Sequence, residues 1–85
     1  MENVIIRLSE VPPCCAAIVE GVEECAMKPR LEGLGFTGGA CAVRLFSAAG
    51  GDPTAYSIRG TVVALRSRDA AKIIVRSFKN GIDKE

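Results

Sequence analysis

The residues with the clearest chemical potential in this chain are its four cysteines, Cys14, Cys15, Cys25 and Cys41. Cys14 and Cys15 are adjacent, so in an extended segment their thiols point to opposite faces and do not easily share a metal ion. Neither Cys25 nor Cys41 belongs to a C-x-x-C pair, the spacing on which zinc sites are usually built. The pattern therefore favours small apolar or idle thiols, and a cysteine-based iron or zinc site is the less favoured alternative.

A second set of candidates consists of carboxylates. Glu20, Glu23, Glu24 and Glu32 cluster in the sequence, and carboxylate oxygens are the ligands that hard cations prefer. The chain has no D-x-D-x-D-G loop, however, so these glutamates are more typical of a solvated face than of a metal site. Histidine is absent, which removes the commonest general base and the commonest metal ligand. With no nucleophile beside a base, we expect a protein that is not an enzyme, with no catalytic residue, no cofactor and no assigned metal ligand.

Size and charge narrow the class of partner. The chain has 85 residues, a hydrophobic content of 48% and a net charge of +1, which fits one globular domain and gives no electrostatic reason to bind nucleic acid or an anionic membrane. The basic residues of the C-terminal half lack the aromatic rings on which bases usually stack. No apolar run approaches the roughly 20 residues that span a bilayer, and the N-terminal residues lack the basic region, apolar stretch and small-residue cleavage site of a signal peptide. We expect a cytoplasmic protein with reduced thiols.

The apolar pattern predicts a mainly β domain. The stretch 59–75 is expected to contain the end of one strand, a corner at Gly60, a second strand, a helical turn capped by Ser67, and the start of the last strand. This order of elements is the one by which a small barrel closes. A single domain is expected over 1–78, followed by a flexible polar tail at 79–85. We predict a small five-stranded barrel with two short helices: strands at 14–22, 41–46, 56–59, 62–66 and 74–78, and helices at 29–34 and 68–73.

The end of the first predicted helix is the apolar feature most open to a functional interpretation. Leu34 and Phe36 flank Gly35, which supplies a stop signal for the helix. The favoured interpretation is that Phe36 packs back on the helix end as part of the core. The alternative is an exposed apolar patch that receives another protein.

Several short motifs occur along the chain. Each one is a weak signal alone, but their order and spacing together are specific for one family. They resemble the FeoA family of ferrous iron transport proteins, whose fold also occurs at the C-terminus of iron-dependent repressors, and the resemblance covers about residues 8–77. Two positions depart from the family pattern, namely Pro29, where a helix-compatible residue is common, and Cys14, where glycine is common. The motifs are Leu8-Ser9-Glu10-Val11, Arg30-Leu31-x-x-Leu34-Gly35-Phe36-Thr37-x-Gly39, Gly51-Asp52-Pro53, Tyr56-x-Ile58-Arg59-Gly60 and Ala64-Leu65-Arg66-x-x-Asp69-Ala70.

The resemblance implies an SH3-like barrel in the bacterial cytoplasm that associates with FeoB, a membrane permease for Fe(II) with a cytosolic GTP-binding domain. Our leading hypothesis is a non-enzymatic accessory protein that binds the cytosolic region of this permease and modulates transport, reaching the membrane only through it. No nucleic acid is expected as a partner. The candidate contact residues are Arg30, Leu31, Leu34, Phe36, Arg59 and Arg66.

Two other interpretations stay open. The runner-up is a metal-sensing or metal-binding module for Fe(II) or Zn, related to the C-terminal domain of the repressors. A repressor-type dimerisation or peptide-binding domain is the third, and a weak homo-oligomer is compatible with each of them. The chain contains no helix-turn-helix and could not regulate transcription alone.

Overall fold

The computed structural model describes residues 3–78, so the polar tail expected at 79–85 lies outside the described residues. These residues form one antiparallel sheet with two short helices, and 3₁₀ turns lie at Leu8–Glu10 and Ala49–Gly51. The strands are β1 (Asn3–Arg7), β2 (Ala16–Val22), β3 (Cys41–Ser47), β4 (Thr54–Ile58), β5 (Thr61–Leu65) and β6 (Ile73–Phe78), and the helices are α1 (Lys28–Gly33) and α2 (Ser67–Ala70).

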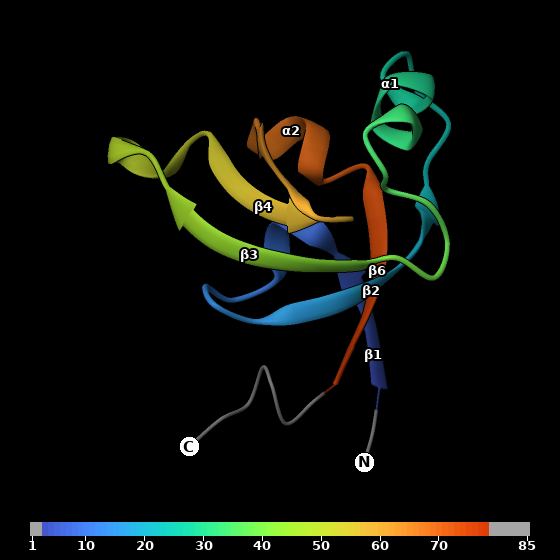
Figure 1. Cartoon of the computed structure of the whole chain (residues 1–85), viewed down its shortest axis with the longest axis horizontal. Coiled ribbons are helices and arrows are strands. Elements are labelled where there is room, and N and C mark those ends of the chain that lie inside the picture. Colours follow the sequence, from blue (N-terminus) through green and yellow to red (C-terminus); the bar gives the residue numbers. More distant parts are fainter. Residues whose placement is uncertain (1–2, 79–85) are drawn as a thin grey trace.

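The sheet has six strands in the order β1-β6-β2-β3-β4-β5. The pairing register shifts between Val19 and Gly21 of β2 and between Arg44 and Phe46 of β3. Such bulges bend a strand and increase its twist, and the sheet curls around its own core (Figure 1). Among the described strands, β1 and β5 lie at opposite ends of this order and do not pair with each other, so the curled sheet does not close. The prediction of a mainly β fold with two short helices is confirmed.

One strand more is present than the sequence predicted. The additional strand, β1, pairs antiparallel with β6, from Asn3 opposite Phe78 to Arg7 opposite Ile74. Its residues Val4, Ile5 and Ile6 form a continuous apolar run without the alternation that marks a half-buried strand, which is why the pattern did not reveal it. The five-stranded prediction is therefore corrected to six strands.

The first predicted strand also begins later than expected, at Ala16 rather than at position 14. Cys14 has a φ of +66°, which is left-handed backbone and incompatible with a strand. Its N–H donates to the carbonyl of Arg44 at 2.8 Å, which fixes the turn before β2. The residue that departs from the family's glycine thus adopts the conformation that favours glycine.

The core lies on the inner face of the curled sheet. Tyr56 and Ile58 of β4 are almost wholly buried, as the alternation predicted. Burial raises the pKa of the Tyr56 phenol, so this group stays protonated at neutral pH. The other fully buried large apolar side chains come from the first 3₁₀ turn, β2, α1, β6 and the residues after the 3₁₀ turn and α1: Leu8, Val11, Val19, Leu31, Phe36, Ile73 and Val75.

The sequence predicted a cap at the end of α1 and another at the start of α2, and only the first is observed. The N–H of Phe36 donates to the carbonyl of Leu31 and the N–H of Gly35 to that of Glu32, which is the glycine-based cap expected at the end of α1. At the start of α2 the prediction was wrong. Arg66 occupies the N-cap position and Ser67 is the first helical residue, so the Ser67 side chain does not cap the helix. The Asp52 carboxylate instead accepts a hydrogen bond from the backbone N–H of Ser67 at 2.8 Å.

Candidate docking groove between α1 and β5

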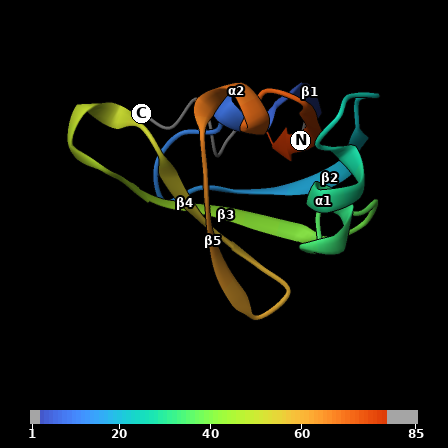
Figure 2. The ribbon, with the colours of Figure 1, turned by 90° about the horizontal axis from the view of Figure 1, so that it is seen from above.

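A shallow groove of about 350 Å³ lies between helix α1 and strand β5. Both elements can be followed in Figure 2, where the hairpin that carries β5 extends from the sheet on the side of α1. Three of the predicted contact residues, Arg30, Leu34 and Arg66, line it together. The complete lining is Met27, Arg30, Leu34, Val63, Ala64, Leu65, Arg66 and Asp69.

Helix α1 forms one wall. Arg30 and Leu34 are four residues apart and therefore lie on one face of the helical turn. Leu31, the residue after Arg30, is fully buried, so another face of α1 packs on the core. Pro29 lies in the first turn of α1, where its missing N–H has no helical partner to lose. The helix is short, but both its ends are compatible with its sequence.

Strand β5 forms the other wall. Val63, Ala64 and Leu65 all line the groove, although consecutive side chains of a strand point to opposite faces. Contact with all three is expected of a groove along the edge of the strand and not of one over a single face. β5 is the last strand in the sheet order, so this edge is the one that faces away from β4.

The groove combines an apolar floor with two guanidinium groups. Met27, Leu34, Val63 and Leu65 supply the floor. Within residues 3–78 the ion pairs join other residues, namely Arg7 to Glu23, Lys28 to Glu24 and Arg76 to Glu20, and neither groove arginine takes part in one. Asp69 is the one carboxylate in the lining, against two guanidiniums.

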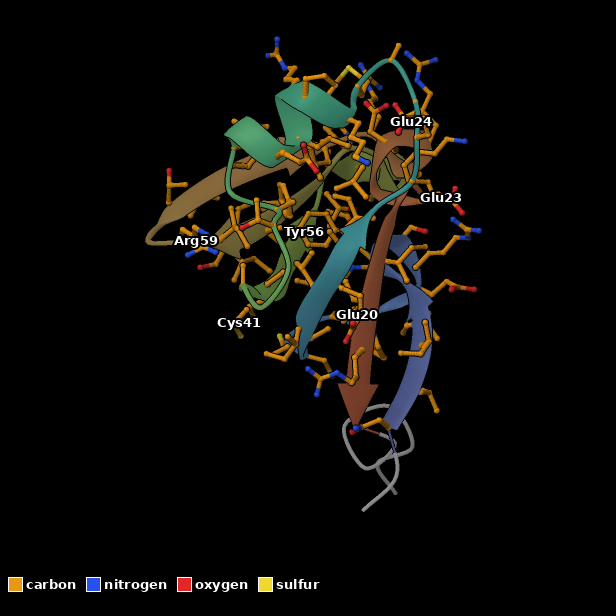
Figure 3. The ribbon with its side chains drawn as sticks, turned by 90° about the vertical axis from the view of Figure 1, so that its right-hand side faces the viewer. Glu20, Glu23, Glu24, Cys41, Tyr56 and Arg59 are labelled. Atoms are coloured by element: carbon orange, nitrogen blue, oxygen red, sulfur yellow. The ribbon has the colours of Figure 1, made fainter. Side chains whose placement is uncertain are left out.

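The remaining predicted contacts lie elsewhere. Leu31 and Phe36 are fully buried, so their side chains pack on the core and cannot meet a partner directly. Arg59 lies in the turn between β4 and β5 (Figure 3). Its Nε donates to the carbonyl of Gly35 at 3.2 Å, and its Nη2 donates to Oγ1 of Thr37 at 2.8 Å. Arg59 therefore joins the β5 hairpin to the end of α1.

Five groove residues were not among the predicted contacts: Met27, Val63, Ala64, Leu65 and Asp69. Met27 lies at helical spacing from other apolar residues, and Val63 and Leu65 alternate with their neighbours as in a strand. Core residues show the same two patterns, so neither pattern singles out a groove residue. Only the pairing order of the strands shows that β5 ends the sheet, and that order is not written in any local motif.

The carboxylates and thiols do not assemble into a metal site in the part of the chain that the structure describes, since no three of His, Cys, Asp and Glu come together there. Glu20, Glu23 and Glu24 each face a different basic residue, and Glu20 lies well apart from Glu23 and Glu24 in Figure 3. All four cysteines are thiols. A hydrogen bond from Arg7 lowers the pKa of the Glu23 carboxyl, so this carboxylate is engaged in an ion pair with Arg7.

None of the helices within residues 3–78 is long and apolar enough to cross a membrane.

Comparison with known proteins agrees with the fold and the motifs. A family profile described as the FeoA domain matches residues 6–77. A comparison with curated protein sequences found no match. Among solved structures, the zinc complex of FeoA from Stenotrophomonas maltophilia is 32% identical, with a TM-score of 0.76 over 82% of this chain and 88% of that one.

Two further structures are similar. FeoA from Chlorobium tepidum is 32% identical, with a TM-score of 0.78 over 88% of this chain and 72% of that one. A FeoA-like protein from Clostridium acetobutylicum is 28% identical, with a TM-score of 0.82 over 92% of this chain and 91% of that one. These likenesses confirm the SH3-like fold class. Because the match to the family profile also spans most of the chain, the chain belongs to the FeoA family, which is associated with ferrous iron transport.

Proposed function

We propose that this protein is a small, non-enzymatic cytoplasmic accessory protein of ferrous iron uptake. In this proposal it binds the cytosolic region of a FeoB-type Fe(II) permease through the groove between α1 and β5 and so modulates transport. The observation that carries the proposal is the groove itself, an apolar floor flanked by guanidiniums that have no ion-pair partner among the described residues. The relative from S. maltophilia is described as a prokaryotic SH3 domain protein and a suggested activating factor of ferrous iron transport.

The groove suits contact rather than reaction. Apolar grooves with polar margins are a recurring way for small domains to hold a peptide segment of a partner. A partner that binds one nucleotide state of a GTP-binding domain more tightly than another shifts the population toward the preferred state. Binding through this groove therefore provides modulation without any catalytic group in the module.

The test is calorimetric titration of the chain with the cytosolic region of the permease. Leu34→Asp places a charge on the apolar floor of the groove and is expected to weaken binding at least about ten-fold, as removal of a central interface anchor usually does. Ile5→Asp is the matched control, because Ile5 is a 61% exposed apolar residue on β1, the opposite end of the sheet order. Equal affinities for the two variants would overturn the choice of this groove, and circular dichroism verifies that both are folded.

The metal-sensing alternative is tested separately, because a relative was complexed with zinc. Fe(II) is titrated into the protein under anaerobic conditions. Tight stoichiometric binding that is lost on Cys41→Ser or Cys14→Ser would favour sensing, since these two thiols are exposed. Absence of binding would leave the docking function as the remaining one.

A further inference from the structure

We infer that the partner segment binds by adding an extended strand to the free edge of β5, with its own acidic side chain against Arg30 and Arg66. This inference rests on the proposed function and specifies the segment that the groove takes: an extended peptide with apolar side chains at alternate positions and at least one carboxylate.

The hydrogen-bonding direction of β5 follows from its hairpin. Arg59 and Gly60 form a two-residue turn with φ values of +47° and +80°, as in the primed turns that join tightly paired strands. The flanking residues Ile58 and Thr61 are opposite each other, and in such a hairpin they exchange both backbone hydrogen bonds. In antiparallel pairs these bonded positions alternate with non-bonded ones. Val62 and Ala64 therefore direct their N–H and C=O groups away from β4.

That outer edge is open. In the described part of the sheet no strand pairs with it, and the ladder between β4 and β5 runs from Ile58–Thr61 to Thr54–Leu65 without a register shift. The strand reads Thr-Val-Val-Ala-Leu and has no proline, lysine or other charge, the usual means by which an exposed edge avoids pairing. Val62 is 60% exposed. β5 thus has the features of an acceptor for another strand.

The groove accommodates the side chains of such an added strand. It runs along the β5 edge and is bounded on its far side by α1 through Met27, Arg30 and Leu34. Every second side chain of an added strand points to the same face, so apolar residues at alternate positions would lie on the floor made by Met27, Leu34, Val63 and Leu65. Main-chain hydrogen bonds would supply affinity and the floor would supply selectivity.

Charge favours an acidic segment over a second copy of this chain. Arg30 and Arg66 have no ion-pair partner within residues 3–78, and guanidinium groups bind carboxylates with strong, directed hydrogen bonds. Residues 61–65 contain no acidic side chain. Pairing of β5 with β5 of another copy would therefore bring no carboxylate from the added strand to either arginine, whereas an acidic peptide would.

The test is backbone amide hydrogen exchange, measured by NMR on the ¹⁵N-labelled full chain with and without the cytosolic region of the permease at saturation. Val62 and Ala64 are expected to exchange rapidly in the free protein and at least about ten-fold more slowly in the complex, because their N–H groups become hydrogen-bonded. Val63, already bonded to β4, and Ile5 on the other edge are internal controls. Binding without slower exchange at Val62 and Ala64 overturns this inference but not the proposed function; absence of binding overturns the proposed function itself.

A pair of substitutions at Ala64 distinguishes backbone hydrogen bonding by the partner from burial of the β5 edge without such bonds. Ala64→Pro removes the outward N–H at a position where an edge strand tolerates proline, whereas Ala64→Val keeps the N–H and changes the side chain. We expect about ten-fold or greater weakening for Ala64→Pro and affinity near wild type for Ala64→Val. Equal affinities would contradict strand addition.

The charge and the identity of the occupant are tested in the same titration. Arg30→Gln with Arg66→Gln is expected to weaken binding about ten-fold or more and to reduce its dependence on salt, and Arg68→Gln, outside the groove lining, serves as the control. An unchanged affinity for the double variant contradicts the acidic segment. Slow exchange at Val62 and Ala64 in the protein alone, together with a dimer in sedimentation equilibrium, would assign the edge to a second copy and overturn the inference.

Discussion

The guanidinium of Arg59 lies over Gly35 and fastens the β4–β5 turn to the end of α1. Its Nε is 3.2 Å from the Gly35 carbonyl oxygen, and its Cδ would be 3.2 Å from a Cβ atom placed on Gly35. Gly35 itself has a φ of +115°. Arg59 thus links the two walls of the groove, α1 and β5, and its contact with Gly35 favours glycine at position 35 for both space and backbone conformation.

Gly35→Ala is the first substitution to examine. The added methyl group meets the Arg59 side chain at a distance that forces it to move, and alanine is disfavoured at a φ of +115°. We expect a loss of roughly 1–2 kcal/mol in the free energy of unfolding, measured with urea. Gly33→Ala is the matched control, since Gly33 is helical and a Cβ there would meet nothing within 4 Å. It is expected to stabilise by about 0.5–1 kcal/mol. Equal effects from the two changes would contradict this account.

The sequence predicts those parts of the fold that depend on local signals. The glycine after Leu34 and the apolar Phe36 that follows predict the end of α1 and the burial of Phe36, and both are observed. Gly60 predicts the turn between β4 and β5. β1 was missed because its apolar run carries no alternation, and its place depends on a partner, β6, at the other end of the chain.

The candidate site was predicted only in part for a similar reason. Arg30 and Leu34 share a helical face that spacing alone reveals, and both line the groove. The β5 wall depends on which strand ends the sheet, and the burial of Leu31 depends on how α1 sits on the core. These are consequences of strand order and packing, so no local motif could indicate them.

Cys14→Gly is expected to stabilise the protein. Cys14 is exposed and has a φ of +66°, and a residue with a Cβ atom pays about 1–2 kcal/mol in that region. Glycine loses part of this gain through the greater freedom of the unfolded chain. The expected net effect is an increase of about 0.5–1 kcal/mol in urea unfolding. Cys14→Ala retains the Cβ atom and should give no such increase; the same increase from alanine would show that the thiol, and not the backbone, is responsible.

Ser77→Ala is expected to stabilise the protein for a different reason. The Ser77 side chain is buried, and its Oγ has no hydrogen-bond partner among the described residues. Leaving a buried hydroxyl unsatisfied costs roughly 1–3 kcal/mol, so its removal should raise the free energy of unfolding by about 1 kcal/mol. Ser47→Ala is the contrasting variant, because the Ser47 Oγ lies 2.7 Å from Oγ1 of Thr54 and bonds with it. Ser47→Ala should destabilise, and a loss of stability in both variants would mean that Ser77 has a partner.

Acid should weaken the fold through the pair of Arg7 with Glu23, whose Nη2 and Oε2 atoms are 2.8 Å apart. The hydrogen bond from Arg7 lowers the pKa of Glu23 in the folded protein below its ordinary value of 4.5. Stability from this pair is therefore fully present above pH 4.5 and is lost as the pH falls through the lowered pKa. Urea unfolding of wild type and Glu23→Gln should show a difference in stability at neutral pH that disappears in strong acid. Glu24→Gln is the control, because the Glu24 side chain is 91% exposed and its contact with Lys28 is 3.4 Å long, so it should match wild type throughout. A difference for Glu23→Gln that persists unchanged at low pH would show that the substitution acts through packing and not through the charge of Glu23.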